Sequence, residues 1–281
     1  MLEFTKIQGN GNDFIVIDNR EGSMTSPDLS RLAASICERR QSVGADGLLV
    51  VEMSERENFT MRLFNNDGSE GEMCGNGARC IARYAWEKKI AGEKMSFETL
   101  AGPIHGVVTA PFVELDMGET NLSQGFWGQS LKVEGETFPF VYLVVGVPHC
   151  ILFVDNLEDF SQDSLRDIGR TVRYDTHRFP KGTNVNFVQR SGERTLKVVT
   201  YERGVEDLTL SCGTGSTASA IAASIVWEMA APIQVQNPGG DNWVTVSFDE
   251  TRSICKTYLK GKTVMIAEGR LYDEALPKDI E

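Results

Sequence analysis

The sequence lacks several features that would assign it to a large class of proteins. Its 281 residues include 28 Lys and Arg against 40 Asp and Glu, a formal net charge of −12, and no run of basic residues is longer than two. Nucleic acid and anionic membrane surfaces are therefore not expected as partners. No apolar run approaches the about 18 residues of a membrane-spanning helix. Residues 1–6 lack the basic-then-apolar layout of a secretion signal, which favours a cytoplasmic location.

Histidines and closely paired cysteines are also scarce. The chain has three histidines, at 105, 149 and 177, and six cysteines, none in a Cys-x-x-Cys pair. A metal site is not predicted from these spacings, and without a secretion signal the thiols are expected to be free. Cys37 has apolar neighbours at helical spacing, and Cys80 follows Cys74 by six residues. Both are interpreted as packing residues.

What the sequence does contain is one motif in two copies. These are Met73-Cys74-Gly75-Asn76-Gly77-Ala78 and Ser211-Cys212-Gly213-Thr214-Gly215-Ser216, each followed by a helix-forming segment, 79–88 or 217–228. The glycines allow a tight strand-to-helix turn. A helix that begins there directs free N–H groups and the positive end of its dipole towards the cysteine, which favours a thiolate and suits a carboxylate ligand. Two such thiols are what a two-base proton transfer at carbon requires.

The similarity between the two copies extends beyond the motif. Cys74 and Cys212 are 138 residues apart, and the same offset aligns Gly102 with Gly240 and the strand-like 95–99 with 233–237. A later pair, 113–118 and 264–269, matches at an offset of 151, as if the second copy held an insertion. A repeat of this length indicates two similar domains rather than a solenoid.

The predicted secondary structure is mixed. Helices are expected from Ser26 to about Arg40 and from Asp159 to Arg173, in addition to the two that follow the cysteines. β-branched and aromatic residues in alternation predict the strands. These are 14–18, 48–52, 60–65, 95–99, 105–109, 138–145, 195–202, 243–248 and 263–267. The pattern favours an α+β fold.

Polar residues cluster around the two motifs. Asn65-Asn66-Asp67-Gly68-Ser69-Glu70 precedes Cys74, and Glu202-Arg203-Gly204 precedes Cys212. Asn-rich turns occur at 9–14 and 182–187, and His149 follows an expected strand. One Asn-Gly turn alone is usually only a turn. Together with the cysteine motifs, these Asn, Glu and Arg residues suit the binding of ammonium and carboxylate groups.

At this point the sequence resembles a known family, the diaminopimelate epimerases. The stretch from Asn65 to Glu70 followed by Cys74-Gly75-Asn76-Gly77-Ala78-Arg79-Cys80 is similar to the family's first active-site signature. The remaining matches, in the family's order, are Gly11-Asn12-Asp13-Phe14, Pro148-His149, Asn184, Glu202-Arg203-Gly204 and Cys212-Gly213-Thr214-Gly215. The resemblance spans essentially the whole chain.

The resemblance implies an α+β fold of two pseudo-symmetric domains. In each, a curved β-sheet or barrel wraps around a central helix, and the active site lies in the interdomain cleft. The N-terminal domain would comprise residues 1–118 plus 269–281 and carry Cys74. The C-terminal domain would comprise residues 119–268 and carry Cys212.

The resemblance also implies an activity. This is the epimerisation of LL-2,6-diaminopimelate to the meso isomer, in lysine and peptidoglycan precursor biosynthesis, with no cofactor and no metal. Cys74 and Cys212 would exchange the α-proton, one as thiolate and one as thiol, and His149 and Glu202 would tune them. The substrate-binding residues implied are Asn12, Asn65, Gly75, Asn76, Asn184, Glu202, Arg203, Gly213 and Thr214. The expected partner is a small amino acid, with no nucleic acid or membrane, and a homodimer is compatible with the sequence.

Three departures from the family pattern concern the distal end of the substrate. Val147 stands where a small polar residue is usual, Gly47 where glutamine is common, and the stretch from Glu202 to Cys212 is one residue longer than usual. None touches the two thiols. Since buried polar recognition is sensitive to one lost partner, these positions affect the identity of the substrate rather than the reaction type.

Three other readings stay open at this stage. A related cofactor-independent racemase, of histidine, lanthionine or hydroxyproline type, would keep both thiols and alter the distal pocket. A cysteine hydrolase using Cys212 and His149 would leave the second Cys-Gly-x-Gly unexplained. A non-catalytic amino-acid-binding or thiol-redox protein on the same fold would be favoured by the loss of either cysteine, and both are present.

Overall fold

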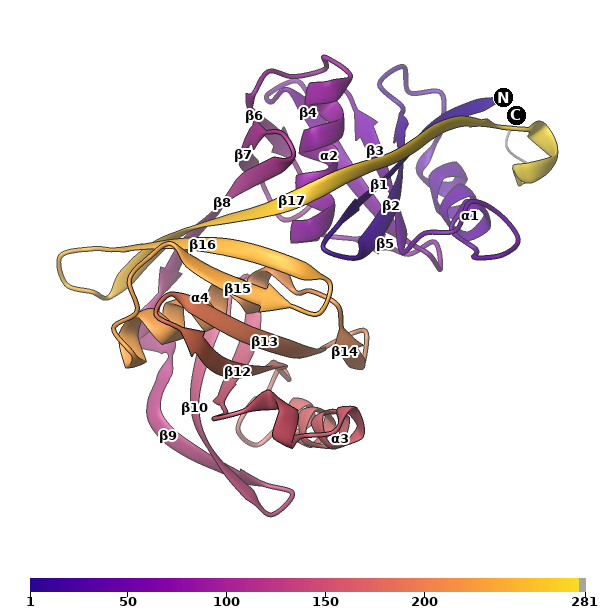
Figure 1. Cartoon of the computed structure of the whole chain (residues 1–281). Coiled ribbons are helices and arrows are strands. Elements are labelled where there is room, and N and C mark those ends of the chain that lie inside the picture. The colour runs from indigo at the N-terminus through magenta and orange to yellow at the C-terminus, as the bar shows by residue number, and fades with distance from the viewer. Residues whose placement is uncertain (278–281) are drawn as a thin grey trace. The chain divides into compact units, whose positions relative to one another are not determined.

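The computed structural model describes residues 1–277, which form two compact units (Figure 1). Unit 1 comprises Met1–Asp116 and the chain from Gly261 onward, and unit 2 comprises Met117–Lys260. The helices are α1 (Ser26–Ile36), α2 (Gly75–Glu87), α3 (Gln162–Arg173) and α4 (Gly213–Val226), with short 3₁₀ helices η1 (Leu122–Gln124), η2 (Leu157–Asp159) and η3 (Asp273–Ala275). Within residues 1–277, no helix is long and apolar enough to cross a membrane.

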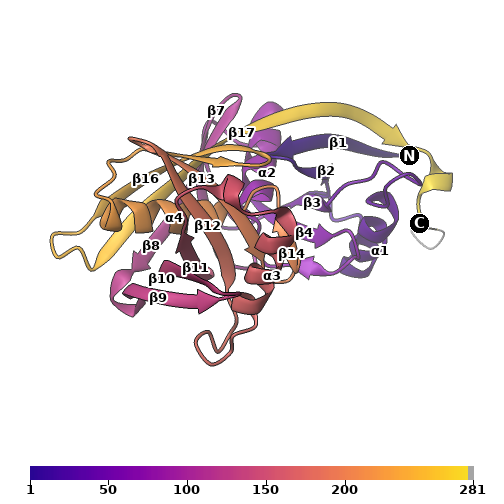
Figure 2. The same ribbon diagram turned by 60° about the horizontal axis from the view of Figure 1, so that its bottom comes forward.

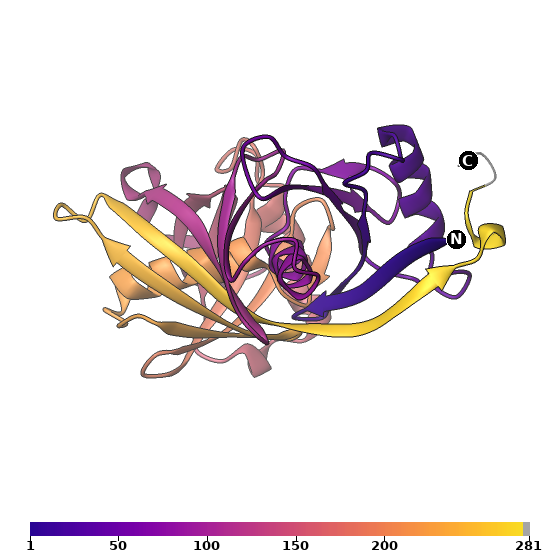
Figure 3. The ribbon, with the colours of Figure 1, turned by 90° about the horizontal axis from the view of Figure 1, so that it is seen from above.

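Unit 1 is a curved sheet in which parallel and antiparallel strand pairs alternate. β2 pairs in parallel with β3, β3 antiparallel with β4, β4 in parallel with β6, and β6 antiparallel with β7. The strands are β1 (Leu2–Gly9), β2 (Asn12–Asp18), β3 (Gly47–Glu52), β4 (Phe59–Asn65), β5 (Glu70–Gly71), β6 (Lys94–Glu98), β7 (Ile104–Thr109), the start of β8 (Phe112–Asn121) and the end of β17 (Ile254–Leu271). Figure 3 views α2 nearly end-on, surrounded by these strands.

Both faces of the unit 1 sheet are covered, so its central strands read as continuous apolar runs. Leu48 and Val50 of β3 pack with α1 on the outer face. Leu49, between them, faces α2, where its side chain approaches Gly77. α2 contacts β1, β2, β3, β4 and β7. The sheet therefore encloses α2 and fixes the position of its first residues.

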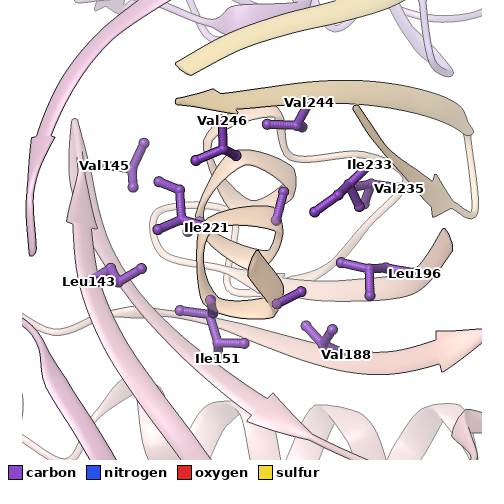
Figure 4. Close-up of a cluster of buried hydrophobic side chains, with 14 of the residues drawn as sticks. Leu143, Val145, Ile151, Val188, Leu196, Ile221, Ile233, Val235, Val244 and Val246 are labelled. Atoms are coloured by element: carbon purple, nitrogen blue, oxygen red, sulfur yellow. The ribbon is translucent and has the colours of Figure 1, made fainter. Parts of the chain in front are cut away.

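Unit 2 repeats this arrangement. α4 contacts the strands around it, and the apolar side chains between them form one core (Figure 4). α3 lies against β12, β13 and β14 on the other face of the sheet (Figure 2). The strands are β9 (Phe126–Val133), β10 (Glu136–Val145), β11 (Val147–Phe153), β12 (Asn184–Gly192), β13 (Thr195–Glu202), β14 (Asp207–Thr209), β15 (Ile233–Asn237), β16 (Gly240–Phe248) and the start of β17. The α+β class and the wrapping of a curved sheet around a central helix are confirmed.

The registers of the strands show which positions correspond. In unit 1, Phe14 of β2 pairs in parallel with Gly47 of β3, and in unit 2, His149 of β11 pairs in parallel with Asn184 of β12. The next strand is antiparallel in both units, and it is followed by a short strand and the helix that begins after the cysteine. Phe14 and His149 are thus equivalent positions of the two units.

The later part of the repeat was aligned wrongly from the sequence. The offset of 151 matched Val113 with Val264, but Val113 pairs with Val108 of β7, whereas Val264 pairs with Gln8 of β1. Val113 and Val264 both belong to unit 1, where they occupy different places, so the two segments are not equivalent parts of a repeat. The similar residues at 113–118 and 264–269 reflect only that both segments are partly buried strands.

The domain boundaries that the family resemblance implies, after residues 118 and 268, stay a prediction. The two compact units divide after Asp116 and after Lys260. Both divisions fall inside continuous strands, β8 and β17, where no turn or linker marks them. Of the domain expected to include 269–281, residues 278–281 lie outside the described residues.

Candidate active site

Cys74 and Cys212 occupy the same structural position, the residue that caps a central helix. Cys74 is extended (φ −135°, ψ 124°) directly before α2, and Cys212 is extended (φ −112°, ψ 116°) directly before α4. Gly75 and Gly213 are the first helical residues, and both are buried. The free N–H groups of each helix therefore lie beside a thiol, an arrangement that suits an anion.

The Cys74 thiol faces a hydrogen-bond acceptor. Cys74 Sγ lies 3.6 Å from Oδ1 of Asn12, which also accepts from Nδ2 of Asn76 at 3.4 Å. The orientation of the Asn12 amide is fixed from its other end, since its Nδ2 donates to Asp46 Oδ2 at 2.7 Å. The carboxylate of Asp46 can only accept, so the oxygen of Asn12 must face the thiol. This arrangement favours the protonated form of Cys74.

A buried positive charge lies on the next turn of the same helix. Arg79 is fully buried, and its Nη2 donates to Asn76 Oδ1 at 2.8 Å. Its Nε and Nη1 have no hydrogen-bond partner among residues 1–277. Burial lowers the pKa of Arg79, an effect opposed by the thiols of Cys80 and Cys74. The guanidinium fixes the Asn76 amide and adds positive potential at the start of α2.

The Cys212 thiol faces a backbone donor and a hydroxyl group that can donate or accept. Cys212 Sγ accepts from the backbone N–H of Gly215 at 3.4 Å and lies 3.5 Å from Oγ1 of Thr214. At Cys74, by contrast, the side chain accepts no capping hydrogen bond. Hydrogen bonds donated to sulfur stabilise the thiolate. The two motifs are alike in backbone and differ in the described hydrogen bonds at sulfur, an acceptor facing Cys74 and a backbone donor facing Cys212.

This contrast predicts that the two thiols alkylate at different rates. At about pH 7, iodoacetamide is expected to modify Cys212 about tenfold faster than Cys74, the factor that corresponds to about 1.4 kcal/mol of preferential thiolate stabilisation. Exposure alone predicts the opposite order, since Cys74 is partly exposed and Cys212 is 5% exposed. Peptide mapping over time measures both rates, and faster labelling of Cys74 would refute the assignment. Thr214→Val should slow labelling at Cys212 only.

His149 is fully buried on β11, facing α4. Its Nδ1 lies 3.1 Å from Nδ2 of Asn186, and its Nε2 is buried without a hydrogen-bond partner in the described part of the chain. Burial, assisted by the charge of Arg203, lowers the pKa of His149 to about 3. The imidazole is therefore neutral at physiological pH.

Glu202, Arg203 and Asn184 lie together at one end of β12 and β13. Asn184 Oδ1 accepts from the backbone N–H of Arg203 at 2.7 Å, and Arg203 Nη1 donates to the carbonyl of Lys181 at 2.9 Å. Burial raises the pKa of Glu202, and a hydrogen bond with Thr209 opposes the shift. A carboxyl group whose pKa is raised in this way is suited to accept and donate a proton.

Asn65 ends β4 and is exposed. Its Nδ2 donates to Ser69 Oγ at 3.0 Å, within a tight turn that Asp67 closes by accepting from the backbone N–H of Ser69 at 2.9 Å. Asn12 is hydrogen-bonded to both Cys74 and Asn76, whereas no described hydrogen bond joins Asn65 to any of these three residues. Its expected role in substrate binding stays a prediction.

The other four thiols are packing residues. Cys37 lies in the core beside α1, as expected from its apolar neighbours, and Cys80 is fully buried on α2. Burial raises the pKa of Cys37 to about 12 and that of Cys255 to about 11, and it raises those of Cys80 and Cys150 further. These four stay protonated, and no group of three or more His, Cys, Asp or Glu side chains within residues 1–277 could hold a metal.

Two of the departures from the family pattern have a visible structural setting. A side chain at Gly47 would place its Cβ 2.7 Å from the carbonyl oxygen of Phe64, so this backbone admits only glycine there. The longer stretch after Glu202 forms a turn in which Glu206 has φ +58° and accepts from Arg173 of α3 at 2.9 Å. The extra residue is thus accommodated in an anchored turn. Val147 is the first residue of β11 and is partly buried.

Three polar residues that orient predicted site residues were not themselves predicted from the sequence. Asp46 fixes Asn12, Asn186 lies beside His149, and Thr200 donates to Asn186. Asn186 lies in the Asn-rich stretch 182–187 but was not named as a site residue, and from Asn184 onward that stretch is the start of β12 rather than a turn. Asp46 carried no sequence signal, because its contact depends on the parallel pairing of β2 with β3.

Comparison with known proteins agrees with this geometry. The family model described as diaminopimelate epimerase matches residues 4–123 and 141–266. The diaminopimelate epimerase of Aquifex aeolicus is 40% identical over 98% of this chain and 99% of its own length, and that of Archaeoglobus fulgidus is 38% identical over 99% of both.

Solved structures with the same fold are more distant in sequence. A phenazine biosynthesis protein of Bacillus anthracis has a TM-score of 0.75 at 18% identity, covering 96% of this chain and 99% of its own. A hydroxyproline epimerase of Agrobacterium vitis has a TM-score of 0.68 at 13% identity, covering 95% of this chain and 91% of its own. At these identities the likeness concerns the fold alone. The family model and the near full-length relatives, together with the two cysteine-capped helices, show that this chain belongs to the diaminopimelate epimerase family.

Proposed function

We propose that this protein is an isomerase that converts LL-2,6-diaminopimelate to the meso isomer, as its relatives' names indicate, by two-base proton transfer between Cys74 and Cys212. The observation that carries the proposal is the pair of cysteines, each capping the central helix of one unit. The reaction would serve lysine and peptidoglycan precursor biosynthesis.

The proposed step balances without any further reagent. A thiolate takes the α-proton and becomes a thiol, and the other thiol gives its proton to the opposite face of the carbanion and becomes a thiolate. The scheme requires the two thiols to flank one α-carbon. Helix N-termini at Gly75 and Gly213 would stabilise the charge that builds on the adjacent carboxylate, because their N–H groups are already oriented.

The hydrogen bonds around sulfur suggest the starting state. Cys212, which accepts from Gly215 N–H, would begin as the thiolate, and Cys74, which faces Asn12 Oδ1, would begin as the thiol. After one turnover these states are exchanged. The distal ammonium and carboxylate of the substrate would bind to the polar group that includes Asn184, Glu202 and Arg203.

The proposal extends to the setting of the enzyme. The residues assigned to the reaction are this chain's own thiols, so we propose catalysis without pyridoxal phosphate or metal. The partner is a small amino acid, and the proposed location is the cytoplasm. A homodimer stays compatible with these assignments.

Proton exchange in deuterated water tests the function. Purified protein incubated with LL-diaminopimelate and no added cofactor should form the meso isomer, with one deuterium at the inverted α-carbon by mass spectrometry. Because each transfer passes through an exchangeable thiol, the returned hydrogen derives from solvent. If histidine, lanthionine or hydroxyproline exchanges while diaminopimelate does not, the substrate is wrong and a related racemase is supported.

A further inference from the structure

A small polar cluster lies beneath the turn that carries Cys212. It consists of His149, Asn186 and Thr200, one residue each from the adjacent strands β11, β12 and β13. All three are at most 2% exposed, and all occupy the sheet face that packs on α4. Their neighbours on the same face, such as Ile151 and Val188, are apolar core residues. A polar group in this core requires a compensating role.

The same positions in unit 1 are apolar, so the fold does not require the cluster. Asn186 pairs with Ile151 and Thr200, and Leu49 pairs with Val16 and Leu63 in the corresponding strands. The equivalents of the three polar residues are Phe14, Leu49 and Leu63. The polar cluster is therefore specific to the unit that carries Cys212.

The orientation of the Asn186 amide follows from its partners. Its Nδ2 lies 3.3 Å from the carbonyl oxygen of Cys150, which can only accept. Its Oδ1 lies 2.9 Å from Thr200 Oγ1, which can donate. The nitrogen and oxygen of the amide are thus distinguished by an acceptor on one side and a donor on the other.

That orientation decides the tautomer of His149. The second N–H of Asn186 points at His149 Nδ1, 3.1 Å away, so Nδ1 must accept and the ring proton must lie on Nε2. His149 Nε2–H is then a buried donor with no acceptor among the described residues. A buried donor left without a partner is costly, and it is expected where a ligand supplies the acceptor.

Asn186 also contacts the turn of Cys212 itself. A side chain at Gly215 would overlap Asn186 Oδ1 and come within 3.2 Å of both Cys212 Cβ and Thr200 Oγ1. The amide therefore packs directly under the residue whose N–H binds Cys212 Sγ. The Asn186 side chain thus contacts the His149 ring and also packs against the turn that follows Cys212.

We propose that Asn186 is a positioning residue that keeps the His149 proton on Nε2, so that His149 serves as a hydrogen-bond donor to an anionic group of the site and not as a base. The participation of His149 in the reaction rests on the proposed function, whereas its tautomer does not. The acceptor is an anionic atom, either a thiolate sulfur or a carboxylate oxygen. Arg203 supports the same role, since its charge disfavours a second proton on the ring.

Nitrogen-15 NMR of the unaltered protein tests the tautomer directly. His105 and His177 are exposed, so three ring systems with distinct behaviour are expected. Between about pH 5 and 8, the range in which exposed histidines titrate, His149 should show a protonated Nε2 and an unprotonated Nδ1 throughout. The His149→Gln spectrum assigns its signals. A protonated Nδ1, or rapid averaging of the two tautomers, would overturn the proposal.

A substitution at position 186 tests the cause. Asn186→Asp replaces the donor by an acceptor of the same shape, so Nδ1 should become protonated, and kcat should fall about 10- to 100-fold, the effect of losing one hydrogen bond to a charged group, with a much smaller change in KM. If the buried carboxylate prevents folding, Asn186→Leu introduces the residue type found at the equivalent position 49. It should give both tautomers and a similar loss of kcat. Retention of the Nε2–H tautomer alone in a folded variant would refute the role of Asn186.

Ser219→Ala is the matched control. Ser219 is a fully buried residue of α4 whose Oγ donates to the carbonyl of Gly215 at 2.7 Å, and no described hydrogen bond joins it to His149. It should leave the His149 signals unchanged, and a shift as large as that of Asn186→Asp would show that any disturbance near Gly215 moves them and would overturn the assignment. Failure of diaminopimelate to exchange, with the tautomer as expected, would overturn the proposed function and leave this inference standing.

Discussion

Replacing either Cys74 or Cys212 with alanine is expected to lower the rate of epimerisation at least about 10³-fold, because each variant lacks the proton donor or the proton acceptor for one face of the α-carbon. Both variants are expected to fold, since each side chain lies at a helix cap and neither belongs to the apolar cluster around α4. Circular dichroism should be unchanged. The measurement is the initial rate of meso-diaminopimelate formation by chiral chromatography.

Cys37→Ala is the matched control for the cysteine variants. Cys37 is buried beside α1 and belongs to an apolar cluster, so its loss should cost about 1–2 kcal/mol of unfolding free energy while kcat changes little. Turnover near the wild-type rate in Cys74→Ala or Cys212→Ala would rule out the two-base scheme. A loss of activity in Cys37→Ala equal to that of the other two would show that thiol replacement acts through stability.

The second large effect is expected from Gly215→Ala. The added methyl group would overlap Asn186 Oδ1 and crowd Cys212 Cβ and Thr200 Oγ1, each at 3.2 Å. Buried atoms held by hydrogen bonds cannot move away without breaking them, so the turn that presents Cys212 must shift. We expect a loss of about 100-fold or more in kcat and about 1–3 kcal/mol in stability. Enzyme assay and urea denaturation measure the two quantities.

Gly77→Ala provides the comparison, because Gly77 is the equivalent residue of the other motif. Its added Cβ would meet the ends of apolar side chains, Leu49 at 3.2 Å and Met61 and Phe14 at 3.5 Å. Such side chains can adjust by small rotations, so the expected loss of activity is at least tenfold smaller than for Gly215→Ala. Equal losses in the two variants would indicate that both glycines serve only the backbone turn, and that the polar cluster contributes nothing specific.

The local features of the two motifs could be predicted from the sequence. Cysteine followed by Gly-x-Gly predicted a strand-to-helix turn, and α2 and α4 begin directly after Cys74 and Cys212. Both helices start four residues earlier than the expected Arg79 and Thr217, because glycine lowers interior helix propensity but is tolerated in a first turn. α1 ends at Ile36 rather than near Arg40, whose φ of +74° is not helical.

The contacts that orient the site residues could not be predicted in this way. Asn12 and Asp46 meet because β2 and β3 pair in parallel across a long connection, and a single sequence does not specify that register. Neither β11 nor β12 was among the expected strands. Without β11 and its pairing with β12, nothing placed Asn186 beside His149. The chemistry of each motif is local in sequence, whereas its tuning depends on tertiary structure.

The pairing of β1 with β17 constrains the order in which the chain can fold as it is synthesised. β1 begins at Leu2, but its partners on one side run from Thr263 to Leu271. Unit 2 is continuous, Met117–Lys260, and can be complete when unit 1 still lacks this strand. Until then β1 has an open edge that could pair with another chain. β1 is therefore synthesised long before the strand that completes its pairing, and a chain terminated near residue 260 would retain that exposed edge.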